Sequence, residues 1–191
     1  MRYSNPNMLV YIAMADAYAA AVEFIKLPKR NALRDEALTF QRYLAHPTYG
    51  LRPGTYTDDT EMSAANAQVL VHQNEPFTAL MFAEEYVSEF ERGGRRDGYS
   101  RWFQATLERV RTGKELIAVL RPATSTNNGA AMRAVPFGVL PTVRRVLEVA
   151  TLQAGITHDS PEGRFSARAV ALMSHAALYE DVPLLGLGDY C

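Results

Sequence analysis

The chain has 191 residues, of which 48% are hydrophobic and 21% are charged, as in an ordinary soluble globular protein of one domain spanning residues 1–191. Its formal net charge is -1 and it has no Lys/Arg-rich block, which argues against nucleic acid as a partner. Cys191 is the single cysteine, so a disulfide framework or a cysteine-based metal cluster within one chain is excluded, and we expect a cytoplasmic location.

The first predicted element is a helix over residues 8–26, where alanine, leucine and methionine are dense. Asp16 and Glu23 interrupt the apolar run and no basic n-region precedes it, so it predicts a buried helix rather than a signal peptide or a membrane span. Their spacing would place both carboxylates on one helical face. For Asp16 we expect a hydrogen-bonded structural role, whereas Glu23 lies nearer to a loop or cleft.

Prolines and glycines interrupt residues 27–56 too often for a long element other than a helix near 34–44. Helical patterns then follow at 59–73, 77–92, 99–112, near 115–120, at 142–154 and at 161–179. No strand-like alternation, hairpin signal, internal repeat or linker is visible. The sequence therefore predicts an all-α fold, a compact single-domain orthogonal multi-helix bundle.

An acidic stretch begins the helix predicted at 59–73; it reads Thr57-Asp58-Asp59-Thr60-Glu61-Met62. One interpretation is structural, because Thr57 or Asp58 can cap the helix and the acids face the positive end of its dipole. The other is a metal site, because hydroxyl and carboxylate oxygens at the edge of a loop are the donors that Mg²⁺ or Ca²⁺ prefers. From the stretch alone, both interpretations stay open.

A second polar stretch, residues 123–133, contains small hydrogen-bonding side chains followed by small helix formers. Its candidate binding residues are Ser125, Asn127, Asn128 and Gly129. Free backbone N–H groups at a helix start can bind a phosphate or a ribose hydroxyl, and glycine leaves them accessible. The alternative is an Asn-Gly turn followed by an ordinary helix cap.

The third candidate is His158, which lies just before Ser160 and Pro161, a good N-cap and a good first helical residue. A lone loop histidine is more often an exposed surface residue without a function than a ligand, and the other histidines show no ligand-like spacing. His158 and Asp159 form a doublet also found in His-Asp phosphohydrolases, but that chemistry needs several histidines. An isoprenyl-diphosphate enzyme would need a second aspartate-rich helix.

Taken together, the stretches resemble the ADP-ribosylglycohydrolase family, in particular dinitrogenase reductase-activating glycohydrolases. The resemblance rests on Tyr56-Thr57-Asp58-Asp59-Thr60-Glu61-Met62, on Asn128-Gly129-Ala130-Ala131-Met132-Arg133 with Pro136 behind it, and on Thr157-His158, in this order. The run Ala15-Asp16-Ala17-Tyr18-Ala19-Ala20-Ala21-Val22-Glu23-Phe24 is similar to the opening helix of the family, with alanines in place of its two glycines.

The resemblance implies an all-α, magnesium-dependent hydrolase that cleaves the glycosidic bond of ADP-ribosylated side chains or of ADP-ribose-containing metabolites. It implies that Thr57, Asp58 and Asp59 are metal ligands, in a site that holds two Mg²⁺ in the family and one or two here. Glu23 would be catalytic together with Asp58 and Asp59. Ser125, Asn127, Asn128 and Gly129 would hold the phosphates and the nearby ribose, with His158 against the ADP-ribose.

One departure from the family is the lack of its second metal motif, an Asp-x-Asp-Thr towards the C-terminus. The candidate replacements are Asp181 and Asp189. The chain is then expected to be a C-terminally short or minimal member, one part of a split protein, or a member whose metal site a partner protein completes. The alternative function is a non-catalytic ADP-ribose-binding or structural member of the family.

Overall fold

The computed structural model describes residues 7–23, 25, 32–48, 50–180 and 182–191, and over these residues it confirms the all-α fold, with no sheet. The α-helices are α1 (Met8–Ala19), α2 (Ala32–Ala37), α3 (Asp58–His72), α4 (Ala79–Arg92), α5 (Arg101–Arg109), α6 (Gly113–Leu120), α7 (Gly129–Met132), α8 (Val143–Thr157), α9 (Pro161–Tyr179) and α10 (Leu187–Tyr190). Two 3₁₀ helices, η1 (Val135–Val139) and η2 (Leu184–Gly186), complete the described elements. None of the described helices combines the length and the apolar character needed to cross a membrane.

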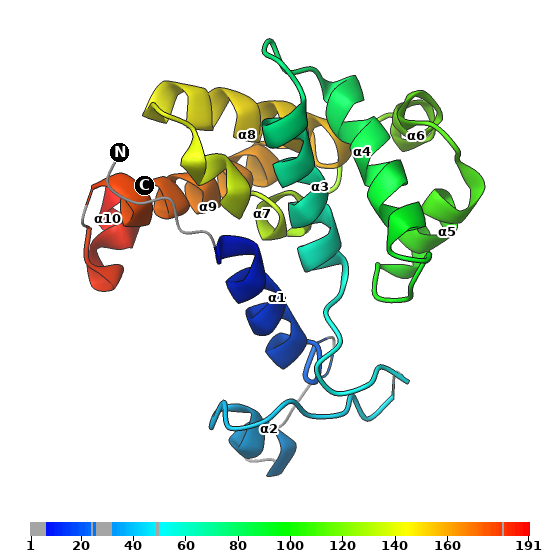
Figure 1. The fold of residues 1–191 in the computed structure, drawn as a ribbon, viewed down its shortest axis with the longest axis vertical. Coiled ribbons are helices and arrows are strands. Elements are labelled where there is room, and N and C mark those ends of the chain that lie inside the picture. The colour runs from blue at the N-terminus through cyan, green and yellow to red at the C-terminus, as the bar shows by residue number, and fades with distance from the viewer. Residues whose placement is uncertain (1–6, 24, 26–31, 49, 181) are drawn as a thin grey trace.

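The core lies between α3, α4, α6, α8 and α9 (Figure 1), and η1 packs against α3, α8 and α9. Its largest apolar side chains include Phe82 and Phe90 on α4, and Phe137 on η1, all fully buried. The rings of Phe82 and Phe137 meet edge to face with their centroids 5.6 Å apart. This packed body supports two helix starts: the start of α3, formed by the acidic stretch, and the start of α7, formed by the polar stretch.

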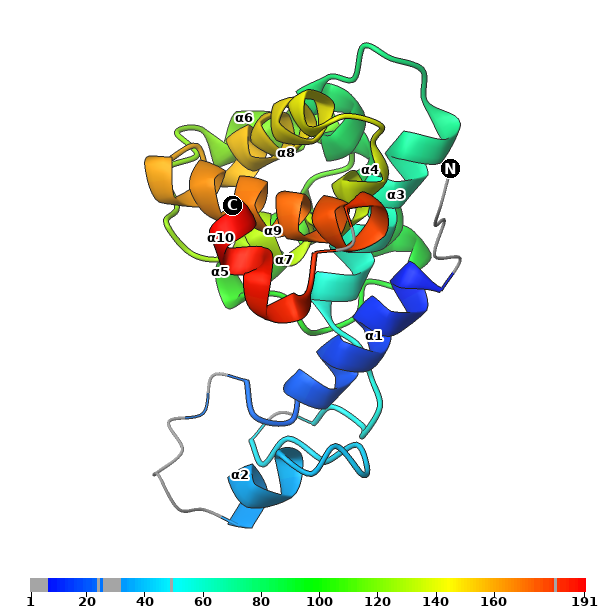
Figure 2. The ribbon, with the colours of Figure 1, turned by 90° about the vertical axis from the view of Figure 1, so that its left-hand side faces the viewer.

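Helix α1 leaves the body and leads to α2 at the far end of the molecule (Figures 1 and 2). The prediction that this apolar helix is buried is wrong: within it only Asp16 and Ala17 are buried, and Val10 and Tyr11 are 54% and 55% exposed. The reason is that α1 packs mainly against α3, so one face is covered and the others meet solvent.

The predicted helix over residues 8–26 is also too long, because α1 ends at Ala19 and a turn follows. The carbonyl oxygen of Glu23 lies 3.0 Å from Nε2 of His46, so a contact with a distant segment replaces continued helix. Asp16 and Glu23 therefore do not share a helical face. Phe24 and residues 26–31 lie outside the described residues.

Other helix boundaries shift for local reasons. The helix expected near 34–44 ends at Ala37, because Phe40 adopts a φ of 52°, which a right-handed helix cannot include. The helix expected at 99–112 ends at Arg109, since the hydroxyl of Thr112 accepts a hydrogen bond from the Glu115 amide and caps α6 instead.

Candidate active site

The start of α3 is held by a carboxylate from α1. Asp16 accepts hydrogen bonds from the backbone N–H and the hydroxyl of Thr57, both at 2.7 Å, and from the same groups of Thr60 at 3.1 and 2.6 Å. The carboxylate is buried, so these four donors replace its lost hydration. Asp16 thus caps α3 from another helix, which is the structural role expected of it.

Three further carboxylates surround this cap. Burial raises the pKa of Asp58 to about 8, and the charges of Asp59 and Glu23 add to the effect. Burial also raises the pKa of Glu23 to about 7, with Asp59 and Asp16 contributing, and the pKa of Asp59 to about 6, with Asp16 contributing. In the described part of the chain no Lys, Arg or His forms an ion pair with Glu23, Asp58 or Asp59.

The oxygens of Thr57, Asp58 and Asp59 form a donor set that suits a divalent cation. Because Thr57 gives its hydroxyl proton to Asp16, the lone pairs of that hydroxyl remain for a ligand. Mg²⁺ is usually held by one or two carboxylates and keeps several waters, so this set fits it chemically. Over the described ranges no group of three or more His, Cys, Asp or Glu side chains could hold a metal, so Asp58 and Asp59 do not by themselves form a complete metal site.

Glu61, the third acid of the stretch, is engaged elsewhere. Its buried carboxylate accepts a hydrogen bond from the Tyr99 hydroxyl at 2.7 Å, and Nε of Arg96 lies 2.7 Å from its other oxygen. The Arg96 guanidinium also lies over the Tyr56 ring, 4.3 Å from its centroid. These contacts attach the loop between α4 and α5 to α3, so Glu61 positions the site and is unavailable as a metal ligand.

A second wall of the site is formed by α7 and the loop after α8. A Cβ on Gly129, the first residue of α7, would lie 2.7 Å from Cε1 of His158, so only glycine allows this ring to approach the helix start. The hydroxyl of Ser160 donates to the carbonyl of Ser125 at 2.9 Å and fixes the loop that precedes α7. The segments around Ser125 and His158, distant in sequence, are therefore held side by side.

A buried guanidinium lies beneath this wall. Arg133 is 1% exposed, and it donates from Nε to the side chain of Gln153 at 2.7 Å and from a terminal nitrogen to the hydroxyl of Thr157 at 2.6 Å. Its guanidinium also lies over the ring of Tyr86, 4.8 Å from the centroid. Burial lowers the pKa of Arg133, yet none of its hydrogen-bond partners is a carboxylate.

The charge state of His158 and its contact with Thr157 determine what the ring can offer to a ligand. Burial and the neighbouring charge of Arg133 lower the pKa of His158 to about 4, so the ring is neutral at pH 7. Nδ1 lies 2.6 Å from the hydroxyl oxygen of Thr157, which already accepts from Arg133. That hydroxyl is satisfied when it donates to Nδ1, which leaves the ring proton on Nε2 and available to a ligand.

These elements enclose one cavity of about 510 Å³. The candidate residues that line it are Glu23, Asp58, Ser125, Asn127, Asn128, Gly129 and His158. Thr57 lines an adjoining cleft instead, and Asp59 lines neither space. The structure thus brings together residues from the turn after α1, the start of α3, the start of α7 and the C-cap of α8. These residues are far apart in the sequence, from Glu23 to His158.

Comparison with known families agrees with this geometry. A family model described as ADP-ribosylglycohydrolase matches residues 8–187. The chain belongs to the ADP-ribosylglycohydrolase family. No curated protein matches it significantly. Membership indicates a hydrolase of the ADP-ribosylglycohydrolase type that acts on an ADP-ribose-containing substrate, and the family's metal dependence agrees with the oxygen donor set at the start of α3.

The remaining residues considered as site candidates do not line the cavity. Asp159 accepts a hydrogen bond from Nε of Arg164 at 2.6 Å, so the His158-Asp159 doublet does not act as a pair of metal ligands. Asp189 is exposed on α10 and lines neither space, and Asp181 lies outside the described residues.

Sequence reasoning missed several residues that line the same cavity: Met62, Ser100, Trp102, Phe103, Met132, Arg133 and Thr157. Arg133 and Thr157 belong to the motifs that carry the family resemblance, so an arginine that ends an otherwise small and apolar run was a usable signal. Trp102 is the single tryptophan of the chain and is 61% exposed beside the cavity, but nothing in its local sequence marks it as a binding residue.

Proposed function

We propose that the chain is a magnesium-dependent hydrolase that cleaves the glycosidic bond between ADP-ribose and a protein side chain or a small acceptor. One observation carries the proposal: a single cavity is lined by the carboxylates of Glu23 and Asp58, by the helix start at Asn128, and by His158. Carboxylates suit ribose hydroxyls and a developing positive charge, whereas a helix start suits phosphate. ADP-ribose contains both kinds of group.

In this proposal the polar stretch before α7 holds the pyrophosphate. Ser125, Asn127, Asn128 and Gly129 offer hydroxyl, amide and backbone donors to the cavity. The buried charge of Arg133 lies beside them with no carboxylate among its hydrogen-bond partners in the described part of the chain, so it favours an anionic ligand. His158 adds an Nε2 donor to the ADP-ribose.

Thr57, Asp58 and Asp59 would hold Mg²⁺, because they supply only oxygen donors and lack a cationic side-chain partner in the described part of the chain. When bound, the ion polarises ribose hydroxyls and offsets the repulsion among the carboxylates. The mutual position of Thr57 and Asp16 keeps the hydroxyl lone pairs free for it.

Glu23 would control the hydrolytic step, since it lines both the cavity and the adjoining cleft. The bond from the anomeric carbon to the acceptor nitrogen or oxygen breaks, and the oxygen of one water forms the new bond to that carbon. A carboxylate at this junction can orient the water and take its proton, while the acceptor receives a proton as it leaves. Loss of Glu23 should therefore slow turnover far more than it weakens binding.

The test is Mg²⁺-dependent release of ADP-ribose from arginine-linked and serine-linked peptides, with calorimetry of free ADP-ribose alongside. The parent should turn over at least one substrate, Glu23→Gln should bind ADP-ribose but turn over slowly, and the double variant Asp58→Asn, Asp59→Asn should lose its response to Mg²⁺. Glu180→Gln is the matched control, because this exposed carboxylate lines neither space.

A second candidate function is ADP-ribose binding without catalysis. The observation that favours it is that the described residues include no group of three or more His, Cys, Asp or Glu able to hold a metal. ADP-ribose binding by the parent with no turnover of either linkage, at any Mg²⁺ concentration, would decide for this candidate.

A further inference from the structure

A second cleft of about 740 Å³ adjoins the cavity. One side is formed by the end of α1 and the loop before α3, and the other side by α5 and the loop that precedes it. Glu23 and Ser100 line both spaces, so the cleft and the cavity meet at these two side chains. Whatever occupies the cleft therefore lies next to the residue that the proposed hydrolysis assigns to the reacting bond.

The α5 side of this cleft presents hydrogen-bond acceptors. Asp97 and Glu108 line it with exposed carboxylates, and in the described part of the chain neither forms an ion pair with a cationic side chain. Gln104 lies between them, and its buried side-chain oxygen has no hydrogen-bond partner. Among the described residues that line the cleft, Arg101 is the one with a cationic side chain, so acidic residues exceed basic ones in this part of the lining.

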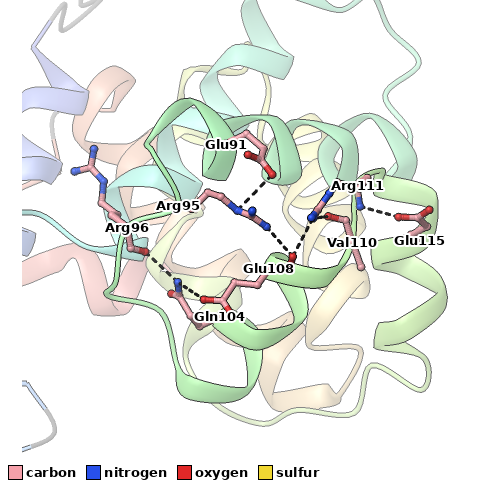
Figure 3. A network of polar contacts seen from close by, with 8 residues as sticks. All are labelled: Glu91, Arg95, Arg96, Gln104, Glu108, Val110, Arg111 and Glu115. Carbon is pink, nitrogen blue, oxygen red and sulfur yellow. Dashed lines mark hydrogen bonds and ion pairs between the residues drawn. The ribbon is translucent and has the colours of Figure 1, made fainter.

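Gln104 and Glu108 belong to a network of polar contacts that includes neighbouring arginines (Figure 3). Arg95 and Arg111 donate to the backbone carbonyl of Glu108 at 2.6 and 2.9 Å. The side-chain nitrogen of Gln104 lies 3.3 Å from the carbonyl of Arg96 and 3.4 Å from the carboxylate of Glu108. The arginines thus bind backbone oxygens and neighbouring carboxylates, and among the described residues none of them pairs with the Glu108 side chain.

We propose that this cleft binds the acceptor part of the substrate, the polypeptide around the modified side chain, and that it prefers basic segments. This inference rests on the proposed hydrolase function, because it places the scissile bond at the junction marked by Glu23 and Ser100. A protein acceptor must continue outward from that junction, and the cleft is the space that begins there. Lysine and arginine side chains supply the donors and the positive charge that Asp97, Glu108 and Gln104 lack.

The experiment compares substrates that share ADP-ribose and differ in the acceptor. These are ADP-ribosyl-arginine, an ADP-ribosylated arginine peptide with lysine on both flanks, and the same peptide with glutamate on both flanks. The parent should show a kcat/KM about tenfold higher for the basic peptide than for the acidic one. The double variant Asp97→Asn, Glu108→Gln should lose most of this preference, Glu108→Lys should reverse it, and Glu180→Gln should keep it.

The small substrate separates this inference from its rivals. Its kcat/KM and the affinity for free ADP-ribose should change less than twofold in the double variant, because neither Asp97 nor Glu108 lines the cavity. A loss of ADP-ribose affinity in that variant would show that the cleft holds part of the nucleotide, and an unchanged peptide preference would show that the acceptor lies elsewhere; either result overturns the inference. If the parent binds ADP-ribose without turnover, the peptide affinities are compared instead. Failure of the parent to bind ADP-ribose would overturn the proposed function and this inference together.

Discussion

The two walls of the cavity are supported in different ways. The acidic wall stands at the start of α3 and is held by one carboxylate, Asp16, which belongs to a helix outside the main body. The wall that carries His158 stands on Arg133 and Gln153, inside the core, where several neutral partners share the contacts. One wall depends on a charged group at an interhelical contact, and the other on a buried polar network.

This difference indicates how each wall should respond to change. Loss of a carboxylate that satisfies four donors leaves all of them unpaired at once, whereas a network loses one partner at a time. We therefore expect the acidic wall to fail abruptly and the opposite wall to fail gradually.

The largest expected effect is that of Asp16→Ala. The variant leaves buried donors of Thr57 and Thr60 without an acceptor, and the free energy of unfolding should fall by about 3–5 kcal/mol. Urea unfolding measures the loss. Asp35→Ala, an exposed aspartate of α2, is the control and should change stability by less than about 0.5 kcal/mol. A loss below about 1 kcal/mol in Asp16→Ala would mean that α3 starts correctly without this cap.

The next prediction compares two variants within the wall that carries His158. Gln153→Ala removes one side-chain acceptor of a buried cation and should cost about 2–3 kcal/mol, because Nε of Arg133 is left without a partner. Arg133→Met removes the charge itself but leaves the side-chain oxygen of Gln153 without this donor, so it should cost about 1–2 kcal/mol while it weakens ADP-ribose binding. Unfolding curves and calorimetry of both variants give the order, and the reverse order of stability would contradict the role assigned to Arg133.

The sequence predicted the fold class and most helix positions, because apolar periodicity and caps are local. It failed at α1, where strong helix propensity extended the element past Ala19, although a turn follows there and the Glu23 carbonyl contacts His46. The exposure of α1 could not be predicted from the sequence either. An apolar helix is expected to be buried, and only the packing of the helices shows that α1 is covered mainly by one neighbour, α3.

For the site, the chain's own chemistry pointed to stretches whose residues line one cavity, but not to the partner that each side chain takes. Asp16 and Glu61 have the same type of side chain as Asp58, yet the first binds two threonines and the second binds Tyr99 and Arg96. Partners so far apart in sequence cannot be assigned from spacing. The membership of Trp102 in the cavity is a similar case, because it depends on how α5 packs.

Trp102 lines the cavity but belongs neither to the Asp16 contacts nor to the Arg133 network, so a variant at this position tests binding separately from stability. The side chain is 61% exposed at the cavity, so Trp102→Ala should leave the unfolding free energy unchanged within about 0.5 kcal/mol. If the indole stacks on the adenine, ADP-ribose should quench the fluorescence of this single tryptophan, and the variant should bind roughly tenfold more weakly. Trp102→Phe should retain most of the affinity, and no quenching with equal affinities would remove Trp102 from the binding site.

The smallest expected effect is the pH dependence of the unfolding free energy that comes from His158. The folded pKa of His158, about 4, lies below the ordinary value of 6.5, so between these pH values the unfolded chain binds a proton that the folded chain does not. The free energy of unfolding should therefore fall as the pH drops from 6.5 to 4, and solvent at the cavity mouth reduces this contribution to about 1 kcal/mol. His158→Asn lacks the titrating ring, so its stability should fall less over the same window. Urea unfolding at pH 7, 5.5 and 4.5 measures the difference, and parallel pH profiles for the parent and the variant would show that His158 is not held neutral by the fold.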